Sequence, residues 1–389
     1  MERKSSPCLV VLIMLVIGWT TLPQSPAQTA GDRLQAVGQS DRTIWNGVTV
    51  SADGRIFVNF PALSPRPHES VGEVGQDGKS HPYPAGEWNS WEPGKPVEHA
   101  FVGTNAVRVG PDGALWVVDT GTPSFGAETL PNAPKIVRID LQQNSVTRIY
   151  PLGPKAALPN SYIDDIRFHG HLAYLTDAGV PGIIVLDLTT GKTRRVLDHD
   201  RSTTGTRPIV VDGEIVLGSD DKPLLINTDQ MEVSPDGKWL YFQPLAGPMY
   251  RVATKWIDDP LIANVARHVA FWYDTPPLGG TAIDAAGNLY LEDLTSDSIL
   301  KVTPDRHLTK VIQDHRLHWV DAPWIRDGKL YLPEAQLDRA EQFHHGHSMI
   351  QWPLHIYTYQ LTLDDPMREH SGSSASHAKK FEWRVVSGN

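Results

Sequence analysis

The chain has 389 residues, of which 40% are hydrophobic and 21% are charged, and its formal net charge at pH 7 is -10. A chain of this length and composition can bury a large core as one or two domains. Its acidic balance argues against nucleic acid or an anionic membrane surface as a partner.

Residues 1–27 have the pattern of a secretory signal peptide. Arg3 and Lys4 precede the apolar run CLVVLIMLVIGWTTL, and Ser25-Pro26-Ala27 supplies a small-residue cleavage site. The run is short for a membrane span, which favours cleavage near Ala27 over the alternative of an uncleaved anchor. We therefore expect a secreted or periplasmic protein with no stable membrane association after cleavage.

The single cysteine, Cys8, lies within this first segment, so the mature chain can form no disulfide. A domain of this size has enough core to fold without one. The chain also has no Asn-x-Ser/Thr sequon, which favours a bacterial protein over a eukaryotic one.

Six stretches after residue 44 share one plan, in which a short strand and a tight turn with Gly lead to a second strand rich in aromatic and β-branched residues. A turn of this kind between alternating apolar runs is a strong hairpin signal. Repeats 41 to 67 residues apart, each composed mostly of strands, predict an all-β, six-bladed β-propeller with four-stranded blades over residues 45–369. The turn glycines are Gly54, Gly113, Gly170, Gly237, Gly287 and Gly328.

The remaining segments are expected to be excursions from this ring. Residues 61–96 are rich in Pro and Gly and are expected to loop over one face instead of forming blade strands. We treat residues 28–44 as an N-terminal segment and residues 370–380 as a low-complexity linker. Either the strand-like residues 381–389 or Leu34 to Val37 is expected to complete a blade with the opposite terminus, because closure removes an open sheet edge.

Polar side chains recur where the innermost strand of each repeat begins. Eight residues before the turn glycine stand Asn46, Asn105 and Asp229, and the third repeat, with its shorter turn, offers Asp165, with Asp164 beside it. If the innermost strands converge on one axis, the oxygen atoms of Asn46, Asn105, Asp165 and Asp229 form a site for a divalent ion. This donor set suits Ca²⁺ or Mg²⁺ best, with Zn²⁺ as a further candidate.

A structural alternative accounts for each of these residues singly. Asn and Asp are common where a strand begins, because their side chains form hydrogen bonds with nearby backbone. Other candidates are weaker: the histidines of FHHGHS lie in a loop-like segment and lack a matching carboxylate. Trp45, Trp319 and Trp324 adjoin the axial positions and are candidates for the wall of a pocket.

Two stretches carry a family resemblance, YLTDAGVPGIIVLDLTTGKTRRVLDH at 174–199 and DQMEVSPDGKWLYFQPLAGPMYRVAT at 229–254. They resemble the Yellow and major royal jelly protein family, and the similarity extends from about Trp45 to Tyr359. The resemblance implies a secreted six-bladed propeller. Members are linked to pigment formation, dopachrome conversion, binding of small amines or storage. The lack of cysteines in the mature chain and of sequons departs from the insect members.

A more distant resemblance is to the gluconolactonase and senescence marker protein propellers, in which Glu, Asn, Asn and Asp hold a central ion. The matching positions are Asn46, Asn105, Asp165 and Asp229, with Asn in place of the first Glu and Asp in place of the second Asn. The resemblance implies that Asp229 handles protons in any catalytic version.

The sequence thus favours a propeller that binds a small polar or aromatic molecule in its axial pocket, with a divalent ion at the floor. The alternative is a metal-dependent lactonase or tautomerase in which Asp229 is the catalytic residue.

Overall fold

The computed structural model describes residues 33–63 and 67–361. Residues 1–27 and the two C-terminal segments, 370–380 and 381–389, lie outside the described residues. Within the described ranges no helix is both long enough and apolar enough to cross a membrane.

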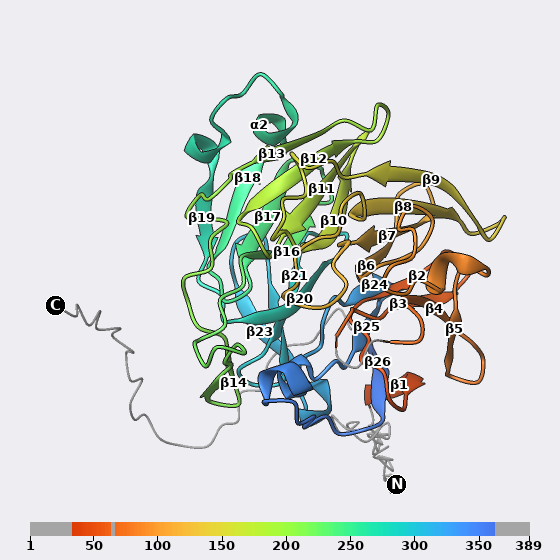
Figure 1. Ribbon diagram of the computed structural model, residues 1–389. Coiled ribbons are helices and arrows are strands. Elements are labelled where there is room, and N and C mark those ends of the chain that lie inside the picture. The colour runs from red at the N-terminus through yellow and green to blue at the C-terminus, as the bar shows by residue number, and fades with distance from the viewer. Residues whose placement is uncertain (1–32, 64–66, 362–389) are drawn as a thin grey trace, which may run out of the picture.

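The predicted six-bladed propeller with four-stranded blades is confirmed, since six antiparallel four-stranded sheets follow one another along the chain (Figure 1). Blades one to three, each from its innermost strand outward, comprise β2 (Val48–Val50), β3 (Ile56–Asn59), β4 (Val71–Val74) and β5 (Ser80–Pro82); β6 (Thr104–Val109), β7 (Leu115–Asp119), β8 (Lys135–Asp140) and β9 (Ser145–Pro151); β10 (Ile163–His169), β11 (Leu172–Asp177), β12 (Gly182–Asp187) and β13 (Thr193–Val196).

The other three blades follow in the same order. They comprise β16 (Thr228–Val233), β17 (Trp239–Pro244), β18 (Met249–Ala253) and β19 (Ala270–Tyr273); β20 (Leu278–Ile283), β21 (Leu289–Asp293), β22 (Ser298–Val302) and β23 (Leu308–Gln313); β24 (Trp324–Arg326), β25 (Lys329–Pro333), β26 (Leu354–Gln360) and β1 (Leu34–Ser40).

The innermost strands close into a ring. Each of β2, β6, β10, β16, β20 and β24 contacts the innermost strand of the next blade, and β24 contacts β2. Figure 1 shows these strands gathered at the centre, with the later strands of each blade farther out.

Strand β1 closes the sixth blade by pairing with β26 from Leu34↔Tyr359 to Ser40↔Leu354. Of the two segments expected to do so, the N-terminal one holds this place. The propeller therefore includes part of the segment 28–44 that we expected to precede it.

The expectation for residues 61–96 is wrong in part, because β4 and β5 are regular outer strands of blade one. None of the prolines of this stretch lies in β4. Pro82 is the last residue of β5, and a strand tolerates proline at such a position.

Each blade buries both of its faces. On β7, Val117 packs in the cluster shared with blade one, and its neighbour Val118 packs in the cluster shared with blade three. Successive side chains on a strand point to opposite faces, so a strand between two blades must be apolar at nearly every position. Six such clusters fill the spaces between the six blades.

Shorter elements lie outside the blades. They are the hairpin β14 (Val210–Val211) and β15 (Glu214–Ile215), helix α2 (Thr254–Asp258) and the 3₁₀ turns η1 (Glu87–Asn89), η2 (Val265–His268), η3 (His315–Leu317), η4 (Leu337–Arg339) and η5 (Glu341–Phe343).

The pairing of β1 with β26 predicts that a mature chain shortened to begin at Asp41 is less stable. Loss of this strand exposes the edge of β26 and the cluster around Leu34, and Tm should fall by at least about 5 °C, which corresponds to ~2 kcal/mol in a domain of this size. Differential scanning calorimetry measures the shift. A chain without residues 381–389 is the matched control and should melt within about 2 °C of the mature protein; an equal loss in the control would contradict the assignment of closure to β1.

Candidate functional site

The loop before an innermost strand is held by a polar side chain at the end of the second strand of the same blade. Asp119, the last residue of β7, accepts hydrogen bonds from the N–H groups of Val102 and Gly103 at 3.0 and 2.9 Å. Asp177, at the end of β11, accepts from Tyr162 N–H at 2.9 Å. These bonds fix the direction in which the chain approaches the axis. In blades one and five the side chains of Asn59 and Glu292 accept corresponding hydrogen bonds. Asn59 accepts from Gly47 N–H at 3.0 Å, and Glu292 accepts from Gly279 N–H at 3.2 Å.

Strand pairing identifies one equivalent position at the start of every innermost strand. In blades two to five this residue directly follows the first paired residue, at a shift of register. In blades one and six its N–H donates to the carbonyl of the last residue of the second strand. The six equivalent residues are Asn46, Asn105, Asp164, Asp229, Gly279 and Asp321.

Five of these six residues line one cavity on the axis. The sixth, Gly279, has no room for a side chain, since a Cβ there would lie 2.3 Å from the carbonyl oxygen of Val320 and 2.6 Å from the Glu292 carboxyl. The floor of the cavity therefore presents two amides and three carboxyls, from blades one, two, three, four and six.

Hydrogen bonds connect the members of this axial cluster. The Asn46 amide donates to the backbone carbonyl of Asn105 at 2.8 Å, and the Asn105 amide donates to the Asp164 carboxyl. Tyr162 donates its hydroxyl to Asn105 Oδ1 at 2.9 Å. The amides are therefore held in fixed orientations, as the structural alternative for a single residue requires, but the three carboxyls of the cluster still converge.

The carboxyls of the axial cluster disfavour ionisation. Burial, followed by the charges of Asp229 and Asp321, raises the pKa of Asp164 well above its usual value. Burial and the charge of Asp321 raise the pKa of Asp229 in the same way, and burial raises the pKa of Asp321 to about 7. A hydrogen bond joins Asp164 to Asp229, so the two carboxyls share a proton. A bound cation would remove this penalty on ionisation.

The structure places Asp165 elsewhere. Its carboxylate accepts from Arg108 Nε at 3.1 Å and Nη2 at 2.8 Å, and from Arg167 Nη1 at 2.7 Å. Arg167 also pairs with Glu232 at 2.7 Å. Burial by itself would raise the pKa of Asp165, but the two guanidinium groups outweigh burial and hold it well below its usual range. Asp165 thus belongs to a charge-paired network, and Asp164 takes the axial place expected for it.

The cause of this error is the length of one strand. Pairing runs from Ile163 to His169 in blade three, one residue longer than from Thr104 to Val109 in blade two. A shift of one residue moves a side chain to the other face of a strand, so a count from the turn selected the wrong Asp.

In the sixth repeat the residue eight positions before the turn glycine is Val320, so the count from the turn misses Asp321, which follows it. The pair Asp321-Ala322 matches Asn105-Ala106 in blade two, and this short signal was sufficient to find it.

Apolar and aromatic side chains form the walls of the axial cavity, which has a volume of about 180 Å³. By the same measure of volume, one water molecule needs about 10–15 Å³, so the cavity is large enough for a small organic molecule. Of the three tryptophans expected near the axis, Trp319 lines the cavity. Trp45 is fully buried and donates to the carbonyl of Glu334, and Trp324 lies beside Arg108. Other wall residues are Phe125, Tyr162, Ile209, Leu224, Leu245, Leu337 and Phe343.

The histidines of FHHGHS do not line the axial cavity. His344 contacts the backbone carbonyl of Asp338 at 2.9 Å, and His345 lies 3.5 Å from Asp221 at the surface. This agrees with the expected loop.

The sequence matches one family model, described as major royal jelly protein, over residues 102–323. No curated protein matches the chain. Among solved structures, a gluconolactonase from Xanthomonas campestris superposes with a TM-score of 0.52 at 14% identity, over 86% of this chain and 91% of that one. At this identity the likeness shows the fold alone.

Two further structures superpose less closely. A virginiamycin B lyase from Staphylococcus aureus has a TM-score of 0.47 at 14% identity, over 84% of this chain and 98% of that one. A calcium-binding protein named regucalcin from Agrobacterium tumefaciens has a TM-score of 0.48 at 12% identity, over 84% and 95% of the two chains.

Substitution by asparagine is expected to change the unfolding free energy very differently at the two adjacent residues Asp164 and Asp165. Asp165→Asn leaves two buried guanidinium groups without their shared partner and should cost about 3–5 kcal/mol of unfolding free energy. Asp164→Asn removes one of three mutually repelling carboxyls and should cost less than about 1 kcal/mol or be stabilising. Urea unfolding at pH 7.5 without divalent cations measures both. A larger loss in Asp164→Asn would show that the two roles are reversed.

The axial carboxyls predict that, without divalent cations, stability falls as the pH rises from about 4 to 7. Below pH 4 Asp321 is protonated in both states; between 4 and 7 the unfolded chain releases the proton while the folded chain keeps it. Each such carboxyl contributes a loss of at most about 1.4 kcal/mol per pH unit. Asp321→Asn should flatten this part of a stability–pH profile measured by urea unfolding, and Asp327→Asn, at an exposed turn of the same blade, should not. Identical profiles for wild type and Asp321→Asn would contradict the shift.

Proposed function

The chain belongs to the major royal jelly protein family, and from this premise we propose that it binds a small polar or aromatic molecule in its axial cavity, together with a divalent cation. The observation that carries the proposal is the convergence of three carboxyls and two amides in a cavity whose other lining residues are mostly apolar. An isolated cluster of carboxyls is costly to bury, and such clusters concentrate where proteins bind ligands.

The donor set fits a hard cation. Asp164, Asp229 and Asp321 supply carboxylate oxygens, and Asn46 can add an amide oxygen because its NH₂ group is the one that donates to Asn105. Oxygen-only sets of this kind are typical of Ca²⁺ and Mg²⁺ sites, and Zn²⁺ is a weaker candidate because no imidazole or thiolate is present in the cluster. When bound, such an ion supplies positive charge that polarises a ligand oxygen.

The walls define the rest of the ligand. Phe125, Trp319 and Phe343 present aromatic surface above the acidic floor, so a molecule with an apolar or aromatic body and one polar end fits in a single orientation. Its polar end, a hydroxyl, a carbonyl or an amine, lies against the carboxyls. A ligand amine would itself supply the positive charge that the floor lacks.

A second function, lactone hydrolysis or tautomerisation, is favoured by the state of Asp229. Burial and the charge of Asp321 raise its pKa, which moves this carboxyl toward the range that general acid–base catalysis requires. In that version a cation bound at the floor would keep Asp229 ionised, and Asp229 would accept a proton from the water or carbon that reacts and return it to the leaving oxygen. We also propose, from the expected signal peptide, that either function is carried out outside the cytoplasm.

The binding proposal predicts that Ca²⁺ or Mg²⁺ raises Tm of the chelator-treated protein. In Asp229→Asn the cation concentration needed for the same rise should be at least about tenfold higher. Titration calorimetry with tyramine, glucose and glucono-δ-lactone, each with and without Ca²⁺, then tests the ligand class. Leu245→Trp, which fills the wall, should abolish ligand binding while the cation response persists. Absence of any response to all cations and all three probes would refute the proposal.

The same samples separate binding from catalysis. Release of acid from the lactone that needs the cation and disappears in Asp229→Ala supports the hydrolase. Binding without turnover supports the binding protein.

A further inference from the structure

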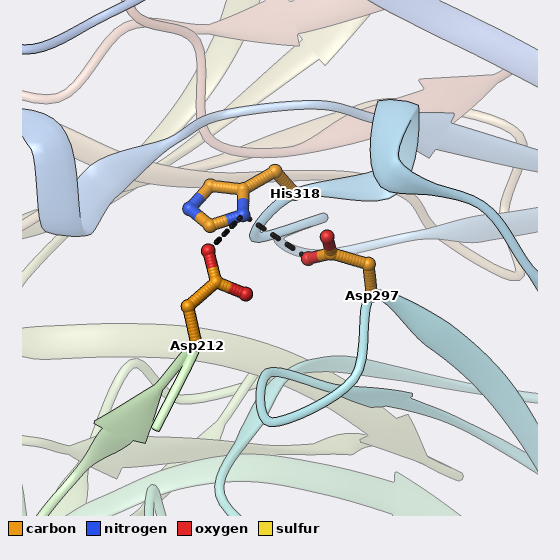
Figure 2. A group of neighbouring side chains, drawn as sticks. All are labelled: Asp212, Asp297 and His318. Carbon is orange, nitrogen blue, oxygen red and sulfur yellow. Dashed lines mark hydrogen bonds and ion pairs between the residues drawn. The ribbon is translucent and has the colours of Figure 1, made fainter. Parts of the chain in front are cut away.

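A second cluster of ligand-type side chains lies away from the axial cluster. Asp212, Asp297 and His318 place one ligand atom each within 4.8 Å of one another. His318 Nδ1 is 3.1 Å from Asp297 Oδ1 and 3.7 Å from Asp212 Oδ2 (Figure 2). The three residues come from the β14–β15 hairpin, the β21–β22 turn of blade five and the segment before β24. None of them lines the axial cavity.

The far side of the imidazole is held in place. Asp338, in η4, contacts His318 Nε2 with both carboxylate oxygens, at 3.0 and 3.1 Å. A carboxylate on the second ring nitrogen of a histidine fixes the tautomer whose other nitrogen is free to bind a metal. His318 is 1% exposed, so this orientation is built into the core, whereas Asp212 is 58% exposed and opens the site to solvent.

The charges of the cluster call for a cation. Asp212, Asp297 and Asp338 are three carboxylates, and their ion pairs in the described part of the chain are with His318 and with Arg339, 3.9 Å from Asp212. A neutral His318 leaves two negative charges without a partner, and a divalent ion balances them.

We propose that Asp212, Asp297 and His318 bind a divalent transition-metal ion, with Zn²⁺ as the best fit. Imidazole nitrogen and carboxylate oxygen are both ligands that Zn²⁺ takes in proteins, and solvent at Asp212 leaves a fourth position for water. The imidazole distinguishes this site chemically from the oxygen-only axial cluster. The inference does not depend on the proposed function.

The ion would connect segments that form the wall of the axial cavity. Ile209 and Leu224 flank the β14–β15 hairpin that carries Asp212, and Leu337 stands beside Asp338; all three of these apolar residues line the cavity. A metal shared by the hairpin, blade five and blade six thus fixes the wall against the rigid ring.

Zn²⁺ binding to the chelator-treated full chain, measured by equilibrium dialysis, tests the proposal. Asp212→Asn should fold normally because Asp212 is exposed, and should weaken Zn²⁺ binding at least tenfold. Asp338→Asn should weaken it about 10- to 100-fold by releasing the imidazole. Asp220→Asn, at an exposed site in the same segment, is the matched control and should bind as wild type does. Amide exchange of residues 209–216 should slow with Zn²⁺ in wild type and not in Asp212→Asn.

The competing arrangement is a protonated His318 that donates to Asp297 and Asp338 without any metal. Equal Zn²⁺ binding by wild type and Asp212→Asn establishes that arrangement and overturns the proposal. The variant Asp229→Asn separates the two sites: if it loses the Zn²⁺ that Asp212→Asn retains, the ion belongs to the axial cluster and this site is refuted while the axial proposal stands. Retention of the site in Asp229→Asn and its loss in Asp212→Asn support the inference.

Discussion

Burial of both faces of every blade is the constraint on which this structure depends. Neighbouring residues such as Val117 and Val118 on β7 pack into different inter-blade clusters, so no blade can be left without a partner on either side. An open ring would expose one apolar face at each end, and pairing of β1 with β26 joins the N-terminal strand to the last blade. Closure of the ring is thus a requirement of core burial, and the geometry of the axis follows from it.

The axis gathers six equivalent residues at one level whatever their chemistry. Three of these residues are Asp164, Asp229 and Asp321. Their carboxyls lie together at the floor of the axial cavity, and ionisation of all three would destabilise the fold. Farther along the same innermost strands the opposite occurs, because Arg108 and Arg167 are matched by Asp165 and Glu232. The protein neutralises one layer of its channel internally and leaves the other uncompensated, and an uncompensated layer that faces a cavity is typical of a binding site.

The segments between the blades give the cavity its character. The ring supplies the polar floor, while residues of the β14–β15 region and of η4 and η5 contribute much of the apolar wall. These same segments carry Asp212 and Asp338, which surround His318. A rigid scaffold that positions variable connecting segments is a common way for one fold to acquire different ligands. For this reason, likeness of fold to a gluconolactonase at 14% identity does not by itself assign an activity.

The sequence by itself determined the blade number, the position of the hairpins and three of the axial residues, Asn46, Asn105 and Asp229. These are local properties, because alternation of apolar residues and turn glycines are both read within about fifteen residues. Tertiary structure decided between Asp164 and Asp165, since the choice depends on a strand that is one residue longer, and a single residue reverses the face of a side chain. It also decided which terminal strand closes the ring and brought Asp212, Asp297 and His318 together. Those contacts join residues far apart along the chain. Their distances in space depend on how the blades pack, and the spacing of the residues in the sequence does not give these distances.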